Sequence, residues 1–540
     1  MTRARSRSAA RRKAARRKKS PPATRPKASK GTEERGLGPL PYPAAFAFVG
    51  SGCLLALEIV GGRILAPAVG NSLYTWTSVI GVVLAGLSIG NYLGGVVADR
   101  RPGRATLSYQ FLASAIAAGL ILVFSRNLTS VAAPAAWPSA LQVLWLALLL
   151  LLLPSILLGT ITPMLVKLTL DSLDSTGRVV GRIQAAASLG AILGVFLTGF
   201  LLVSTFGTRA IVADLAFALL VLAVAANPLW RTKTQEEYNS ATAVISIASV
   251  VMLGVAALSL TYDNPCLRES NYYCIRVFED QSRKYKQLEL DALIHGIVSV
   301  KDPTQLVYPY ERLYGQVVDA KYGTARPVKA FAIGGGTYTF PRYLAKHHHG
   351  NTLVAEIDPA VTDVVRSEFG LRTSPQIRVI NEDARPVLRD RPASDRYDAI
   401  LGDAFGDIAI PYHLVTREFN DLVRSHLKPD GIYLANVVDG VHYDFLRSYV
   451  KTLRKTFPQV RLLIAPGEGL TGKQNTFVVV SSMQPLPQTA NMISPAQVTA
   501  FLNQRDATTL TDDHVPVDQL LEPVFRQRLH QHADSAQAGA

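Results

Sequence analysis

Cysteine is scarce in this sequence, with three among 540 residues, which limits both metal binding and disulfide chemistry. Cys53 lies within an apolar stretch, where we expect it to pack like any small side chain. Cys266 and Cys274 are close neighbours, and no further cysteine or histidine ligands complete a zinc site beside them. We interpret the pair as a disulfide that closes a short loop in an oxidising compartment; two reduced cysteines are the alternative.

Acidic residues are nearly missing from the first 38 positions, where 14 Lys and Arg stand against Glu33 and Glu34. This segment supplies +12 of the net charge of +15. From Asp263 onward 31 basic and 32 acidic residues almost cancel, so we expect no nucleic-acid partner for the folded part. Residues 1–40 are predicted to be a disordered basic tail that touches anionic lipid or fixes membrane topology, with nucleic-acid binding as the alternative. Residues 526–540 are predicted to be a second disordered tail.

A cleavable signal peptide pattern is also missing, because the first apolar stretch is too long and more apolar stretches follow it. Residues 41–262 instead contain seven apolar segments of about 20 residues, the length that crosses a ~30 Å hydrocarbon core. We predict a membrane domain of about seven helices within the lipid bilayer. Small residues such as Gly90 and Gly190 recur along them and favour close helix contact. The predicted helices span 43–66, 74–97, 105–126, 139–161, 183–204, 208–226 and 241–261.

The loops between these segments differ in charge. Basic residues lie on alternate loops, whereas the loops of the other side show Arg126 and Arg209. The positive-inside rule then predicts a cytoplasmic N-terminal tail, and an odd number of helices predicts that everything after Tyr262 is outside the cytoplasm. The basic residues on the cytoplasmic side are Arg100, Arg101, Arg104, Lys167, Arg178, Arg182, Arg231 and Lys233.

Three polar residues lie inside the predicted membrane helices: Glu58 and Arg63 in the first and Asn91 in the second. Charged groups at membrane depth are costly and usually face the protein interior. A structural pair near the membrane interface is the preferred interpretation. Binding or passing a polar solute is the alternative.

After residue 263 the pattern changes to that of an α/β protein. Two β-rich stretches (272–278 and 287–300) and a helix (304–322) predict a small β subdomain over 263–325. Apolar strands then alternate with helical segments over 326–525, which predicts a Rossmann-like domain with a largely parallel, doubly wound sheet. The predicted strands span 328–333, 352–357, 377–380, 397–401, 431–437, 460–464 and 476–480.

Glycines and carboxylates follow the first four of these strands. Gly334, Gly335 and Gly336 end the first strand, where glycine lets the backbone turn tightly and approach a ligand. Glu356, about 20 residues further on, is placed to hold ribose hydroxyls. The third strand leads into Asp383 and Ala384, and the fourth into Asp403 and Asp407. Ligands bind at such carboxyl ends of parallel strands, so the pattern predicts a nucleoside-bearing ligand.

Residues 268–522 resemble the spermidine synthase superfamily, particularly its membrane-fused bacterial members. The resemblance implies a class I methyltransferase-like fold for the α/β domain. It also implies a membrane-anchored transferase of the bacterial inner membrane, with no tightly bound cofactor. Such an enzyme transfers an aminopropyl group from decarboxylated S-adenosylmethionine, its co-substrate, to an amine such as putrescine. The matching motifs are LEIVGGRILAP (57–67), GNYLGGVVADR (90–100), LELDALIH (288–295), FAIGGGTYTFPRYL (331–344), VAEIDPAV (354–361), NEDAR (381–385), YDAILGDAFGD (397–407) and TDDHVPVDQL (511–520).

The resemblance also implies roles for individual residues. Asp403 would be the general base, because a diamine is an ammonium at neutral pH and must lose a proton before it attacks. Asp407 would anchor the distal amine, Glu356 would hold the ribose, and Asp383 with Ala384 would contact the adenine. The three glycines would line the methionine-derived part of the donor. His295 and Tyr310 stand at motif positions that belong to the substrate site.

Several positions depart from the family pattern. Thr337 replaces an Asp that binds the donor's amino group, His295 replaces a glutamine, and of the Tyr-His-Glu motif only Glu311 is retained. Two alternative functions therefore stay open: a methyltransferase that uses S-adenosylmethionine itself, and a transporter or sensor with a ligand-binding but non-catalytic domain. The amine acceptor is not specified, and a homo-oligomer stays open.

Two further motifs have simpler interpretations. The run His347–His349 could bind a metal, but beside a lysine at a helix end it is more often solvated, so no metal site is predicted. Asp512 and Asp513 match the family's C-terminal motif and are interpreted as residues that close the fold.

Overall fold

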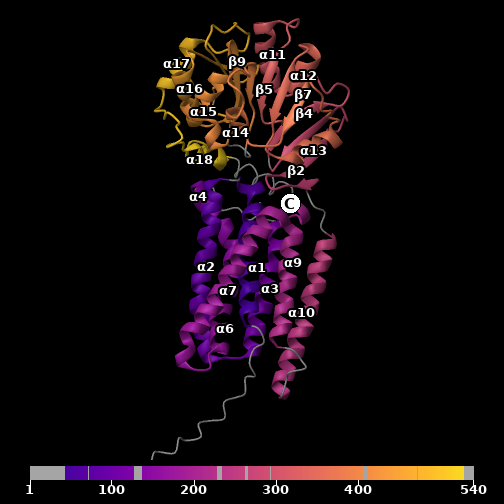
Figure 1. The fold of residues 1–540 in the computed structure, drawn as a ribbon, viewed down its shortest axis with the longest axis vertical. Helices are drawn as coiled ribbons and strands as arrows, with labels where there is room; N and C mark the ends of the chain where they lie inside the picture. Colours follow the sequence, from indigo (N-terminus) through magenta and orange to yellow (C-terminus); the bar gives the residue numbers. More distant parts are fainter. Residues whose placement is uncertain are drawn as a thin grey trace, which may run out of the picture.

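The computed structural model describes residues 43–527, apart from 71, 127–136, 228–233, 262–265, 292, 406–409 and 471. The predicted tails, apart from residues 526 and 527, lie outside the described residues, as do Asp407, Arg231 and Lys233. The protein consists of a helical bundle and an α/β domain that lies on one end of it (Figure 1).

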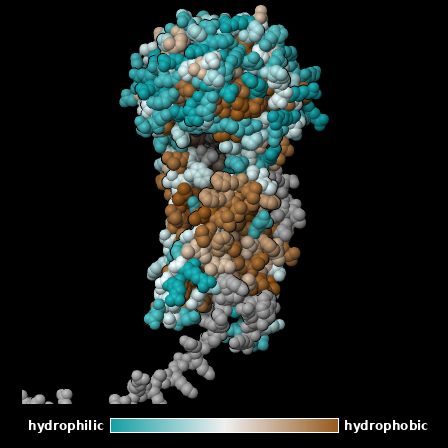
Figure 2. Space-filling model, in the orientation of Figure 1, coloured by the Kyte–Doolittle hydropathy of each residue, from teal (hydrophilic) through white to brown (hydrophobic). Residues whose placement is uncertain are grey.

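Within the described residues, seven helical spans are long and apolar enough to cross a membrane. The predicted segments are therefore confirmed, although the fourth span continues to Thr169 and the fifth begins near Leu173. Figure 2 shows a broad hydrophobic surface along this bundle and a hydrophilic surface over the α/β domain. The helices are α1 (Pro43–Val69), α2 (Leu73–Arg100), α3 (Arg104–Arg126), α4 (Ser139–Ala147), α5 (Leu153–Gly159), α6 (Ile161–Thr169), α7 (Thr176–Leu197), α8 (Val203–Phe206), α9 (Thr208–Ala226) and α10 (Gln235–Thr261).

Small residues allow these helices to pack closely, as predicted. A Cβ atom added at Gly190 of α7 would lie 1.9 Å from the carbonyl oxygen of Phe48 in α1. A Cβ atom at Gly90 of α2 would lie 2.2 Å from the carbonyl oxygen of Ile156 in α5. Any larger residue at either position would separate two helices that are now in backbone contact.

The α/β domain begins with an antiparallel sheet of four described strands, in the order β1-β2-β3-β4. The β-rich stretch predicted over 287–300 is a hairpin rather than one strand, because Asp291 turns the chain with a φ of 54°. The helix predicted over 304–322 begins five residues later, at Pro309, a residue suited to the first helical turn. The elements are β1 (Arg268–Glu269), β2 (Cys274–Glu279), β3 (Tyr285–Leu290), β4 (Leu293–Ser299) and α11 (Pro309–Tyr322).

A second sheet, of seven described strands in the order β10-β11-β9-β8-β5-β6-β7, forms the centre of the domain. All pairs are parallel except those of β11, which runs against both of its neighbours. The predicted, largely parallel sheet is thus confirmed. The strands are β5 (Lys329–Ile333), β6 (Asn351–Ala355), β7 (Ile377–Ile380), β8 (Tyr397–Gly402), β9 (Leu427–Asp439), β10 (Gln459–Ile464) and β11 (Asn475–Ser482).

Helices cover both faces of this sheet, which is therefore doubly wound (Figure 1). Phe331 and Ile333 of β5 pack into one apolar core, and Ala330 and Ala332 pack into the other. The helices are α12 (Thr339–His347), α13 (Pro359–Glu368), α14 (Ala384–Arg389), α15 (Arg417–His426), α16 (Asp444–Thr456), α17 (Pro495–Asn503) and α18 (Val517–Leu520). The chain order reverses between the neighbouring strands β5 and β8, and such a switch point is where open α/β sheets bind ligands.

Polar contacts join the two parts of the protein. The Arg63 guanidinium donates to the carbonyl oxygens of Tyr272 (2.6 Å) and Ser270 (2.8 Å). Among the described residues Arg63 forms no ion pair with Glu58, so the predicted structural pair is wrong, and Arg63 instead contacts the α/β domain. Asn91 is exposed on the outer face of α2.

Two carboxylates of the α/β domain complete this junction. Asp518 accepts a hydrogen bond from the N–H of Leu73 (2.8 Å), and Glu269 accepts one from the N–H of Thr208 (2.8 Å). These N–H groups lie at the N-termini of α2 and α9, where the helix dipole favours negative charge. The predicted disulfide between Cys266 and Cys274 is present, with 5.3 Å between the Cα atoms.

Candidate active site

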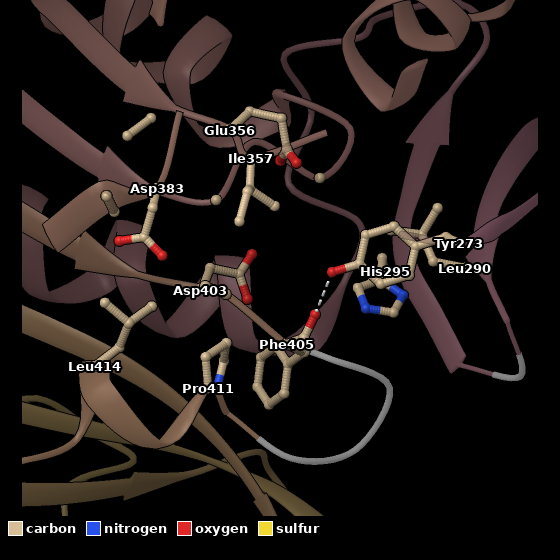
Figure 3. Close-up of a pocket in the computed structure, with 15 residues that line it drawn as sticks. Tyr273, Leu290, His295, Glu356, Ile357, Asp383, Asp403, Phe405, Pro411 and Leu414 are labelled. Atoms are coloured by element: carbon tan, nitrogen blue, oxygen red, sulfur yellow. Dashed lines mark hydrogen bonds between the residues drawn. The ribbon is translucent and has the colours of Figure 1, made fainter. Parts of the chain in front are cut away.

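The candidate site lies at the switch point of the large sheet. Gly334 follows β5 with a φ of 90°, and a Cβ atom there would lie 2.3 Å from the carbonyl oxygen of Asp403, which follows β8. Glycine is therefore required for the two loops to lie against each other. A cavity lies beside them, and Glu356, Asp383 and Asp403 surround it (Figure 3).

Glu356 follows β6 and is buried. Its Oε2 accepts a hydrogen bond from the N–H of Gly335 (2.8 Å), and its Oε1 accepts one from the N–H of Asp358 (3.0 Å). Burial raises the pKa of Glu356 to about 7, although both hydrogen bonds act to lower it. The Glu356 carboxylate therefore holds the loop Gly334–Gly336 in place and also faces the cavity.

Asp383 follows β7 and caps helix α14. Its Oδ1 accepts a hydrogen bond from the N–H of Arg385 (2.8 Å), and its Oδ2 lies 2.7 Å from Nε2 of His413. Burial alone would raise the pKa of Asp383, but these hydrogen bonds and the nearby positive charges outweigh it and lower the pKa. Asp383 is therefore ionised, and it lines the cavity next to Ala384.

Asp403 follows β8 and lies between two cavities. One of its oxygens, Oδ2, accepts a hydrogen bond from the Tyr310 hydroxyl (2.6 Å), and Oδ1 accepts one from Nδ2 of Asn436 (2.8 Å). Burial raises the pKa of Asp403 to about 6, while the bonds from Asn436 and Tyr310 lower it. A carboxylate with this pKa is ionised at neutral pH and suited to take up a proton.

A second cavity shares His295, Asp403 and Phe405 with the first. Tyrosine hydroxyls and amide side chains supply most of its polar groups. Nδ1 of His295 lies 2.8 Å from the carbonyl oxygen of Leu293, so Nδ1 carries the proton and Nε2 is the other ring nitrogen. The other residues that line this cavity are Leu293, Ile294, Tyr308, Tyr310, Asn436, Val438, Gln474, Asn475 and Thr476.

The structure brings most of the predicted site residues together. Tyr310 lines the second cavity, and Gly335 contacts the site through its bond to Glu356. Asp407 lies outside the described residues. The predicted residues that line the first cavity are Gly334, Gly336, Glu356, Asp383, Ala384, Asp403 and His295.

Two positions of the family pattern, the replaced Thr337 and the retained Glu311, are buried and line neither cavity. Thr337 is buried, its hydroxyl lies 2.9 Å from that of Thr339, and its side chain packs against Gly296. Thr337 therefore does not line either cavity. Glu311 is buried beneath the site, and burial raises its pKa well above the usual range.

Sequence reasoning missed three residues of the site. Tyr273 lines the first cavity from the small sheet, and its hydroxyl donates to the carbonyl oxygen of Phe405 (2.8 Å; dashed line in Figure 3). Phe405 lies inside the YDAILGDAFGD motif (397–407). Asn436 could have been identified as an amide within the otherwise apolar strand predicted over 431–437. No sequence pattern around Tyr273 indicated that it belongs to the site.

The remaining motifs lie outside the site. His348 is buried with Nε2 2.8 Å from Oδ1 of Asp319, so it is not solvated as the sequence suggested. Within the described part of the chain, no group of three or more His, Cys, Asp or Glu side chains is arranged to hold a metal ion. Asp512 forms a paired contact with Arg385 (2.6 and 2.9 Å) that ties the C-terminal segment to α14.

The fold and the site together define a class I methyltransferase-like domain with a cavity bordered by carboxylates at its switch point. Residues 312–490 match the model of the spermine/spermidine synthase domain. Over these residues the α/β domain is therefore similar to the spermine/spermidine synthase domain.

Curated relatives share this part of the chain. A probable polyamine aminopropyl transferase of Bifidobacterium longum is 35% identical over 109 residues, 20% of this chain and 24% of that protein. A polyamine aminopropyltransferase of Vibrio vulnificus is 33% identical over 178 residues, 31% of this chain and 57% of that protein. The chain thus spans between about a quarter and just over half of the length of these relatives.

A longer but weaker match reaches into the helical part. A polyamine aminopropyltransferase of Oceanobacillus iheyensis is 23% identical over 440 residues, 76% of this chain and 79% of that protein. The α/β domain from Asp263 onward is shorter than this match, so the match includes part of the helical bundle.

Proposed function

We propose that this protein is a membrane-anchored aminopropyltransferase that uses decarboxylated S-adenosylmethionine and an amine such as putrescine. The observation that carries the proposal is the position of Asp403, a buried carboxylate shared by two cavities. One cavity has carboxylates at the positions suited to ribose and adenine. The other has hydroxyls and amides suited to an amine. A base between donor and acceptor is what the transfer requires.

The reaction proceeds by direct displacement. Asp403 attracts the acceptor ammonium and takes one proton from it, which frees the nitrogen lone pair. The nitrogen then attacks the propyl carbon bonded to the sulfonium, and the carbon–sulfur bond breaks. The electron pair of that bond stays on sulfur, so methylthioadenosine leaves as a neutral thioether. Tyr310 and Asn436 hold the carboxylate in place through one hydrogen bond to each oxygen.

The donor binds in the cavity of Figure 3 under this proposal. Glu356 accepts hydrogen bonds from the ribose hydroxyls, Asp383 and Ala384 border the adenine, and the loop Gly334–Gly336 borders the propylamine chain. His295 and Phe405 lie between donor and acceptor. Asp407, predicted to anchor the distal amine, lies outside the described residues.

A methyltransferase that uses S-adenosylmethionine is the second candidate. The Asp of the family pattern, which would repel the carboxylate of that donor, is replaced by Thr337, although Thr337 itself lines neither cavity. Mass spectrometry separates the two functions, because aminopropyl transfer yields methylthioadenosine and methyl transfer yields S-adenosylhomocysteine. We expect methylthioadenosine when the purified protein is incubated with decarboxylated S-adenosylmethionine and putrescine. Formation of S-adenosylhomocysteine alone would reject the proposal.

We also propose that the helical bundle spans the bacterial inner membrane with the α/β domain outside the cytoplasm. The charge of the loops supports this orientation. Arg100 ends α2 and Arg104 begins α3, so both lie away from Leu73, the first residue of α2, which contacts the α/β domain. The 28 residues of α2 separate its two ends by about 40 Å. The disulfide between Cys266 and Cys274 supports an oxidising compartment.

A further inference from the structure

One short loop contacts both the helical bundle and the candidate site. This docking loop, residues 266–274, is closed by the disulfide between Cys266 and Cys274. It leads from the last membrane helix, α10, into strand β2. Its middle residues, Glu269 to Tyr273, carry the contacts to both sides.

On the side of the bundle, the docking loop contacts two helices. Arg63, near the C-terminal end of α1, donates to the carbonyl oxygens of Ser270 and Tyr272 at 2.8 and 2.6 Å. Glu269 accepts a hydrogen bond from the N–H of Thr208 at the start of α9 (2.8 Å). A charged guanidinium that holds two carbonyl oxygens of one turn fixes both the position and the orientation of that turn.

On the side of the site, the same turn supports two walls of the first cavity. The Ser270 hydroxyl donates to Oδ2 of Asp358 (2.5 Å) and accepts from the N–H groups of Tyr272 and Tyr273. The N–H of Asp358 in turn donates to Oε1 of Glu356. Tyr273 lines the cavity itself, and its hydroxyl holds the carbonyl oxygen of Phe405, two residues after Asp403. Figure 3 shows Tyr273 and Glu356 on the border of the same cavity.

We infer that Arg63 is a positioning residue of the adenosyl-ligand site. Through the docking loop Arg63 holds Tyr273 and the Asp358–Glu356 contact at the border of the cavity, so the helical bundle supports the binding site without lining it. This inference rests on the proposed function for the identity of the ligand. Because coupling between two parts of a protein is reciprocal, ligand binding also strengthens the docking of the two domains.

The test compares two variants of the full-length protein in detergent, each of which removes one contact between the domains. Arg63→Gln removes the contact to the docking loop. Asp518→Ala removes the hydrogen bond between Asp518 and Leu73. Neither residue belongs to the docking loop, so this variant is the matched control. With methylthioadenosine as the probe, titration calorimetry is expected to show a Kd about tenfold weaker for Arg63→Gln, a usual size for such coupling. The Kd of Asp518→Ala should stay within about twofold of wild type.

Hydrogen exchange provides a second measurement that does not depend on the ligand. The peptide that covers residues 267–273 should exchange faster in Arg63→Gln than in wild type, and should be unchanged in Asp518→Ala. If Arg63→Gln does not fold, Arg63→Lys replaces it, and we expect an intermediate Kd because an ammonium lacks the planar fork of the guanidinium.

Three outcomes are decisive. An equal loss of affinity in both variants would mean that breaking any contact between the domains weakens binding, which would overturn the inference. An unchanged Kd with unchanged hydrogen exchange in Arg63→Gln would mean that Arg63 has no positioning role, which would also overturn it. A lowered melting temperature with an unchanged Kd would also overturn it, because that is the result of a purely structural role. If the wild-type protein binds neither methylthioadenosine nor S-adenosylmethionine, the proposed function fails, and the exchange measurement alone decides whether Arg63 positions the loop.

Discussion

At the scale of single residues, Asp403 differs from the other carboxylates of the site in what it touches. Both of its oxygens accept hydrogen bonds from uncharged side chains, Tyr310 and Asn436, and it borders both cavities. Replacing Asp403 with Asn keeps the shape but removes the proton acceptor. We expect the rate of methylthioadenosine release to fall by roughly 10² to 10⁴ while the affinity for the donor changes little. An unchanged rate in Asp403→Asn would exclude the proposed mechanism.

The pKa values of the site predict how activity depends on pH. Burial raises the pKa of Asp403 to about 6 and that of Glu356 to about 7, so both carboxylates gain protons as the pH falls. Protonated Asp403 cannot act as the base, and protonated Glu356 holds the ribose less well. We therefore expect kcat/KM to fall below pH 7. Below pH 6, a plot of log kcat/KM against pH should have a slope greater than one, because both carboxylates are then protonated. In Asp403→Asn the residual activity should lose the steeper part of this profile.

Glu356 is expected to act on binding rather than on turnover. It accepts N–H bonds from Gly335 and Asp358 with its two oxygens, and the amide of a glutamine would direct an NH₂ group at one of them. Glu356→Gln should therefore disturb the glycine loop and weaken the affinity for methylthioadenosine by roughly 30- to 1000-fold, equivalent to about 2–4 kcal/mol. Glu382→Gln removes the same charge at an exposed neighbouring position and should bind as wild type. Equal affinity in both variants would contradict the assignment of Glu356.

At the scale of elements, the disulfide constrains the docking loop. Closing a loop of nine residues restricts the unfolded chain by about 2–3 kcal/mol in the chain-entropy model. A double Ser variant of Cys266 and Cys274, or treatment with dithiothreitol, should weaken methylthioadenosine binding because Tyr273 loses its support. Cys53 is the free cysteine of the described residues, so a Cys53→Ala variant is the control and should respond to dithiothreitol as wild type does. A reductant effect that disappears in Cys53→Ala would refute this prediction.

The sequence predicted the elements of the large sheet well because each strand is an apolar run bounded by polar or turn residues. Strand β7 (Ile377–Ile380) has the predicted bounds, and β9 (Leu427–Asp439) is longer at both ends. The reversed direction of β11 was beyond prediction, because the apolar pattern of a buried strand is the same in either direction. The β3–β4 hairpin was missed because a turn at Asp291 barely interrupts the alternating pattern.

The candidate site was predictable where its residues follow strands and beyond prediction where distant elements meet. Gly334, Glu356 and Asp403 each follow an apolar run, and parallel strands bring such ends to one edge. Tyr273 and Arg63 reach the same region from the small sheet and from α1, and their place depends on how the domains dock. Docking is set by tertiary contacts that leave no periodic trace in the sequence.

At the scale of the whole molecule, the arrangement predicts the orientation in the membrane. The ends of α1, α2 and α9 that contact the α/β domain lie opposite to the basic residues Arg100 and Arg104. We therefore expect a reporter that is active only outside the cytoplasm to be active when fused after Tyr262 and inactive when fused after Arg101. The second fusion is the internal control. Activity only of a cytoplasm-dependent reporter at Tyr262 would reverse the proposed orientation.

The contact between Asp518 and the start of α2 has a consequence for biosynthesis. Asp518 caps a helix that begins 445 positions earlier in the chain. At roughly 5–20 residues per second, a ribosome needs about 20–90 s to make the intervening polypeptide. During that interval the N–H of Leu73 lacks the Asp518 carboxylate as its acceptor. The junction between the domains is therefore completed late, after nearly all of the α/β domain has been made.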